Sequence, residues 1–195
     1  SSTTDSLGSI IIYKRFQNFE SYYDLPVAEY TGRPETANEF YEQCRLLALY
    51  YKASILYENE KKGLFTYFSH KHAEYLLADQ PEIIKDIIKD STVTRGKGIH
   101  MVKEIKIWGE RLVKEWLNEE YAPGKKNLTK IYSEPLLEEL ISFSMEGNYD
   151  RVMAFILVMI YKEQLFNLSV KEKKSTVRKK LFEQPLFLSY GIYTE

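Results

Sequence analysis

The stretch Ala53-Ser-Ile-Leu-Tyr-Glu-Asn-Glu60, followed by Lys61-Lys-Gly-Leu-Phe-Thr-Tyr-Phe68, decides the predicted fold. It begins as a short apolar run and ends abruptly in acid, which indicates a buried strand reaching the surface. A turn and a helix are expected to follow. Open sheets place their binding sites where strands end. Glu58 is therefore placed to bind a divalent cation, provided that a second acid lies beside it.

A candidate second acid is Asp150, in Gly147-Asn-Tyr-Asp-Arg-Val-Met-Ala154 at the start of a strongly apolar helix. Hard cations such as Mg²⁺ and Mn²⁺ prefer carboxylate oxygens, and two-metal phosphodiester hydrolysis needs carboxylates from separate elements. Each acid also has an ordinary explanation. Glu58 can be a solvated acid where a strand surfaces, and an acid in a first helical turn gains roughly 0.3–1 kcal/mol from the helix dipole.

The composition describes a globular chain of 195 residues with 44% apolar and 28% charged residues. This length fits one large domain, or one domain with an appendage. The net charge is −1, so an anionic partner requires a local basic patch.

Cys44 is the single cysteine, which excludes an intramolecular disulfide and fits a reducing compartment and a buried thiol. No run reaches the ~18 apolar residues of a membrane span, and no signal peptide opens the chain.

The first half of the chain reads as an α/β sheet protein. Turn signals, β-branched runs and helical periodicity predict the following order: strands at 8–15 and 25–31, a helix at 36–51, a strand at 53–58, a helix at 61–71 and a strand at 74–79. Thr36 and Glu39 form a capping box for the first helix. The order predicts a mixed sheet with an antiparallel pair followed by crossover helices.

The second half is predicted to be mainly helical. Residues 80–100 read as a mobile loop or small hairpin, 101–120 as an amphipathic helix, and 121–129 as a loop. Helices are expected at 134–143, capped by Ser133, and at 149–166, capped by Asn148. Residues 1–166 are predicted to form the domain, and 167–195 a basic and aromatic C-terminal tail.

The succession of these pieces resembles the nuclease domain of the large terminase subunit, the DNA-packaging protein of tailed bacteriophages. No single motif is specific, and their order carries the resemblance. The matching stretches are Ser9-Ile-Ile-Ile-Tyr13, Val27-Ala-Glu-Tyr-Thr-Gly-Arg-Pro34, Ile55-Leu-Tyr-Glu-Asn-Glu60 with Gly63-Leu-Phe-Thr-Tyr-Phe68, Gly98-Ile-His-Met101 and Asn148-Tyr-Asp-Arg-Val-Met-Ala154.

The resemblance implies a ribonuclease-H-like mixed sheet with flanking helices and an endonuclease that uses Mg²⁺ or Mn²⁺. It makes Glu58 the second and Asp150 the third acid of the active site, and Asp5 an accessory metal ligand. The family's first acid stands on an opening strand, which this chain is expected to lack because it begins too late. The implied setting is the cytoplasm of an infected bacterium. The implied partners are double-stranded DNA, an upstream ATPase domain of the same polypeptide, the portal and the small terminase subunit.

Basic residues near the 80–100 loop are candidates for DNA contact, because phosphate contacts dominate nucleic-acid affinity. They are Arg95, Lys97, Lys103 and Lys106. Acids interleave with them, so a solvated surface is the alternative. The three histidines have no zinc-ligand spacing, and the chain has no Walker-type phosphate loop.

Two other functions fit the same sequence. One is another ribonuclease-H-like nuclease, such as a resolvase or an integrase-like enzyme. A dimer-forming surface and a preference for DNA junctions would favour it. The other is a non-catalytic module that docks to DNA or the portal with a degenerate acid site. Fold resemblance alone does not choose among them.

Overall fold

The computed structural model describes residues 7–15, 23–60, 62–87, 96–144 and 146–182. The chain is a mixed α/β protein, as the sequence predicts at this level. Its described strands form two small antiparallel pairs, β1–β2 and β3–β4, whereas the sequence predicted one larger mixed sheet. Its elements are, in chain order, β1 (Gly8–Lys14), β2 (Leu25–Gly32), α1 (Ala37–Tyr51), α2 (Gly63–His70), the 3-10 turn η1 (Glu74–Leu76), α3 (Ile84–Ile87), α4 (Lys103–Asn118), β3 (Glu120–Ala122), β4 (Lys125–Lys126), the 3-10 turn η2 (Asn127–Lys130), α5 (Glu134–Ser142) and α6 (Asp150–Phe182).

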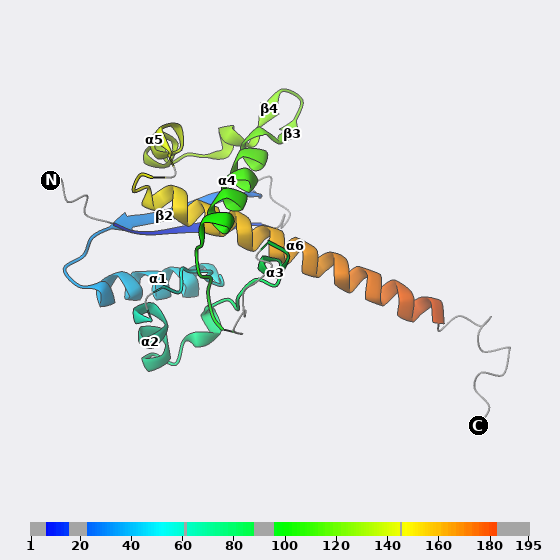
Figure 1. Ribbon diagram of the computed structural model, residues 1–195, viewed down its shortest axis with the longest axis horizontal. Helices are drawn as coiled ribbons and strands as arrows, with labels where there is room; N and C mark the ends of the chain where they lie inside the picture. Colours follow the sequence, from blue (N-terminus) through cyan, green and yellow to red (C-terminus); the bar gives the residue numbers. More distant parts are fainter. Residues whose placement is uncertain (1–6, 16–22, 61, 88–95, 145, 183–195) are drawn as a thin grey trace. The chain divides into compact units, whose positions relative to one another are not determined.

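The strands form a middle layer with helices on both faces. Successive residues of a strand point to opposite faces. In β1, Ile11 enters one apolar core, which contains residues of α4, α5 and α6. Its neighbours Ile10 and Ile12 enter the other core, which contains residues of α1 and α2. Figure 1 shows α1 and α2 on one side of the β1–β2 ribbon and α4 and α5 on the other.

Residues 55–58 belong to the same layer, because their side chains also alternate between the two apolar cores. Leu56 is buried in the first core, whereas Ile55 and Tyr57 are buried in the second. Isolated bridges join this segment in parallel to Leu77 and to Ile99. The predicted strand at 53–58 is thus an extended, buried segment that forms bridges rather than a continuous ladder.

β1 and β2 pair antiparallel, with Gly8 opposite Gly32 and a register shift after Ile12. Beyond this pair, Asp24 adopts a left-handed conformation with a φ of 57°. Its carboxylate accepts the Tyr13 hydroxyl at 2.8 Å and the Trp116 indole N–H at 3.1 Å. Because Trp116 lies on α4, this acid ties the strand pair to the helical layer.

The predicted caps of two helices are confirmed. The Thr36 hydroxyl oxygen accepts the Glu39 N–H at 3.3 Å, and the hydroxyl donates to the Glu39 carboxylate at 3.1 Å. The first bond is the N-cap bond of a capping box, and the second joins the two side chains. Ser133 caps α5 by accepting the Leu136 N–H at 3.2 Å.

Three sequence predictions need correction. Residues 74–76 form a 3-10 turn rather than a strand, because Leu76 and Leu77 donate back to Ala73 and Glu74, and only residues 77 and 79 form bridges. Residues 120–126 form the short β3–β4 hairpin instead of an irregular loop. The last helix continues to Phe182, beyond the predicted end at 166.

The chain divides into two compact units, residues 1–161 and residues 162–195, and α6 contributes to both. The segment Asp150–Lys171 is long and apolar enough to cross a membrane by length and composition alone. Core helices of soluble proteins pass the same test. In the first unit, Phe155, Ile156 and Ile160 are fully buried in the core, which accounts for the apolarity of these turns.

Gly109 allows α4 to approach α6 closely. A Cβ atom at Gly109 would lie 2.4 Å from Ile156 Cγ2 and 3.2 Å from Ile160 Cδ1. Overpacking should cost the Gly109→Ala variant about 1–3 kcal/mol. Alanine gains roughly 1 kcal/mol in helix propensity, so the net loss of stability should be up to about 2 kcal/mol.

Urea unfolding of the Gly109→Ala variant measures this effect. Ile107→Ala, at a half-exposed position of the same helix, is the control and should change stability by at most about 0.5 kcal/mol. A Gly109→Ala chain more stable than the unmodified chain would contradict the close contact.

Candidate active site

The backbone on both sides of Glu58 is fixed by hydrogen bonds to Ile99. The Ile99 N–H donates to the Tyr57 carbonyl and the Asn59 N–H donates to the Ile99 carbonyl, both at 2.8 Å. The Asn59 side-chain amide donates to the Lys97 carbonyl, also at 2.8 Å. Glu58 therefore projects from a stiff point of the chain, and its side chain is partly buried.

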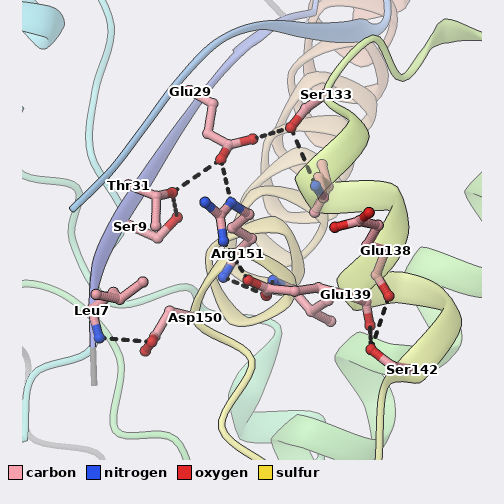
Figure 2. A network of polar contacts seen from close by, with 12 residues as sticks. Leu7, Ser9, Glu29, Thr31, Ser133, Glu138, Glu139, Ser142, Asp150 and Arg151 are labelled. Atoms are coloured by element: carbon pink, nitrogen blue, oxygen red, sulfur yellow. Dashed lines mark hydrogen bonds and ion pairs between the residues drawn. The ribbon is translucent and has the colours of Figure 1, made fainter. Parts of the chain in front are cut away.

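Asp150 is the first residue of α6 and is also partly buried. Its Oδ2 atom accepts the Leu7 N–H at 2.8 Å, a contact between residues 143 positions apart in sequence. Figure 2 shows this bond at the start of β1. The contact fixes the chain just before β1 to the start of α6.

Glu58 and Asp150 lie close enough to interact electrostatically. The pKa of Glu58 is raised, first by burial, then by the negative charge of Glu60 and also by that of Asp150. The charge of Lys106, on α4, acts in the opposite direction and lowers it. The charges of Asp150, 92 positions away in the sequence, and of Lys106 thus both act on Glu58.

The donor set suits a hard divalent cation. Two carboxylates from separate elements supply the oxygens that Mg²⁺ and Mn²⁺ prefer, and Mg²⁺ is commonly held by one or two carboxylates plus substrate phosphates. Within the described ranges, no group of three or more His, Cys, Asp or Glu side chains could hold a metal ion. The pair therefore fits one cation, and a second would need further oxygens from water or substrate.

The predicted DNA-contact residues differ in their surroundings. Lys103 is exposed at the start of α4, and Lys106 is partly buried beside the acid pair. The Lys97 ammonium donates to the Leu77 carbonyl at 2.8 Å and pairs with Asp79 at 2.8 Å. A phosphate would have to compete with these two partners for Lys97. Asp5 and Arg95 lie outside the described residues.

A network of charged side chains is centred on Arg151, the residue after Asp150 (Figure 2). The sequence did not predict this network. Arg151 contacts Glu29 of β2 through Nε and Glu139 of α5 through Nη1, each at 2.7 Å. The other oxygen of Glu29 accepts the Ser133 hydroxyl at 2.6 Å. We call Glu29, Arg151, Glu139 and Ser133 the Arg151 network.

One signal in the sequence could have revealed this network. Arg151 stands in the first turn of a helix, where the helix dipole disfavours a positive charge. A cation at that position implies an acidic partner nearby. The partners could not be named from sequence, because Glu29 is 122 positions away in the chain.

Comparisons of the chain with protein-family models, with curated proteins and with solved structures find no match.

Because burial and neighbouring negative charge raise the pKa of Glu58, its ionised form destabilises the folded chain. The folded state holds this proton more tightly than the unfolded state, so the penalty appears as the pH rises above the ordinary glutamate pKa of about 4.3. Glu58→Gln should raise the melting temperature by a few degrees at pH 7. The gain should disappear at pH 4 and below.

Thermal unfolding followed by circular dichroism between pH 3.5 and 7.5 measures the difference between the two chains. Glu120→Gln, at an exposed position of the β3–β4 hairpin, is the matched control and should behave like the unmodified chain. A Glu58→Gln chain less stable than the unmodified chain at pH 7 would show that the carboxylate is favourably paired.

Proposed function

We propose that this chain is a ribonuclease-H-like nuclease domain that hydrolyses DNA phosphodiester bonds with Mg²⁺ or Mn²⁺. The observation that supports the proposal is the electrostatic interaction of Asp150 with Glu58, two acids that come from different elements. Like-charged, partly buried carboxylates repel each other unless a cation joins them, and such pairs cluster at functional sites.

The roles of the residues follow from their positions. Glu58 and Asp150 would hold the cation from the end of the extended segment and the start of α6, with Asp5 as an accessory ligand. When bound, such cations activate water and stabilise charge on the phosphodiester oxygens. Lys106, beside the acids, would attract the DNA phosphate, and Lys103, Lys97 and Arg95 would extend the basic contact.

The biological setting follows from the resemblance given above. We propose that the domain produces genome ends during DNA packaging as part of a phage large terminase subunit. Its partners would be double-stranded DNA, an ATPase domain of the same polypeptide, the portal and the small terminase subunit in the bacterial cytoplasm.

A docking module with a degenerate acid site is the second candidate. The observation that favours it is the size of the acid group, since the described residues supply a pair at this position and no group of three. A docking module would bind DNA or a packaging protein without cleaving DNA.

Conversion of supercoiled plasmid to nicked and linear forms in Mn²⁺ tests the proposed activity. Glu58→Ala and Asp150→Ala should each lower the rate by more than about 100-fold, because even ligand-supporting residues commonly cost 10–100-fold. Glu120→Ala should cleave at the rate of the unmodified chain. Replacing Mn²⁺ with Ca²⁺ or EDTA should abolish cleavage.

Two results would count against a nuclease. Cleavage that persists in both alanine variants would place the activity elsewhere. DNA binding by the unmodified chain without cleavage in Mn²⁺ would favour the docking module.

A further inference from the structure

The start of α6 is capped by an acid from another helix. The first N–H groups of a helix have no partner within the helix. Here the Arg151 N–H donates to Glu139 Oε2 at 2.9 Å, and the Val152 N–H donates to the same oxygen at 3.3 Å. Glu139 lies on α5, so the two helices are joined at the turn that carries Asp150. A carboxylate at this end also interacts favourably with the helix dipole.

The side chain of Arg151 strengthens the same junction. Its guanidinium contacts the other oxygen of Glu139 and one oxygen of Glu29. The side chains of Arg151, Glu29 and Glu139 are only 20%, 17% and 19% exposed. Charge-assisted bonds from a planar guanidinium fix direction as well as distance, and lysine cannot reproduce this geometry.

The network continues into the strand layer and into α5. Glu29 Oε1 also accepts the Thr31 hydroxyl at 3.0 Å, and Thr31 contacts the Ser9 hydroxyl of β1 at 2.8 Å. Ser133, which donates to the other oxygen of Glu29, is itself the cap of α5. As Figure 2 shows, β1, β2, α5 and α6 all meet around Arg151.

We infer that the Arg151 network positions Asp150 for cation binding, with Glu139 and Arg151 as its central positioning residues. Asp150 is covalently next to Arg151 and is the first residue of the helix that Glu139 caps. A small shift of this turn moves the Asp150 carboxylate relative to Glu58. Metal sites require ligands held to about 0.5 Å by the shell behind them. This inference rests on the proposed metal site.

The test is the affinity of Mn²⁺ for the protein without DNA, measured by titration calorimetry or by the electron paramagnetic resonance signal of free Mn²⁺. Glu139→Gln keeps the shape of the side chain but removes its charge. This change should weaken Mn²⁺ binding by about 10-fold or more, as loss of groups supporting metal ligands commonly does. Glu138→Gln, the exposed neighbour on the same helix, is the matched control and should bind Mn²⁺ like the unmodified chain.

Circular dichroism shows whether each variant is folded at the temperature of the titration. A folded Glu139→Gln chain with the Mn²⁺ affinity of Glu138→Gln would overturn the inference. If Glu139→Gln does not fold, Glu29→Gln replaces it. This second variant leaves the α6 cap in place and should weaken Mn²⁺ binding in the same direction, and unchanged affinity would again overturn the inference.

Failure of the metal site itself gives a different result. If the unmodified chain and Glu58→Ala bind Mn²⁺ equally, or neither binds it, the proposed site is wrong, and the positioning role is overturned with it. Weak binding by Glu58→Ala together with unchanged binding by Glu139→Gln would overturn the positioning role alone.

Discussion

The electrostatic interaction of Asp150 with Glu58 is the interaction on which the proposed cation site depends. Each acid is held by a different part of the chain, Glu58 by the hydrogen bonds around Ile99 and Asp150 by the start of α6. Burial and the negative charges of Glu60 and Asp150 disfavour the ionised form of Glu58. A single substitution would remove this interaction, and its presence fits the proposed active site, because active sites commonly trade stability for chemistry. The surrounding structure instead supplies rigid support on both sides.

The two supports differ in kind, and the difference has a consequence for function. Around Glu58 the support is mainly backbone hydrogen bonding, which tolerates many side chains, with one side-chain bond from Asn59. Around Asp150 it consists of side chains, with Arg151 between Glu29 and Glu139. Removing one member of such a partly buried group leaves an unpaired charge, which is costly. Asp150 is therefore the acid whose position depends more strongly on the identity of its neighbours, and a cation joining it to Glu58 would depend on those neighbours too.

The sequence predicted the elements with strong periodicity or caps, and these are α1, α4, α5 and the first turns of α6. Thr36 and Ser133 marked helix starts because a hydroxyl there accepts a free backbone N–H. The segment at 74–76 was predicted wrongly, since a short apolar run does not distinguish a strand from a 3-10 turn. Glu58 and Asp150 were named from their places at element ends. The Arg151 network could not be derived, because its pairings depend on tertiary contacts between residues far apart in the chain.

The central claim is that Glu58 and Asp150 jointly bind one divalent cation. Anomalous X-ray scattering from crystals of the protein grown with Mn²⁺ tests it most directly, because the signal locates the ion without assumptions about its ligands. The account predicts an anomalous peak within about 2.0–2.6 Å of a carboxylate oxygen from each of the two residues, the range of metal–oxygen bonds. If crystals grown at a Mn²⁺ concentration that supports binding in solution show no anomalous peak between the two carboxylates, Glu58 and Asp150 do not bind the cation jointly.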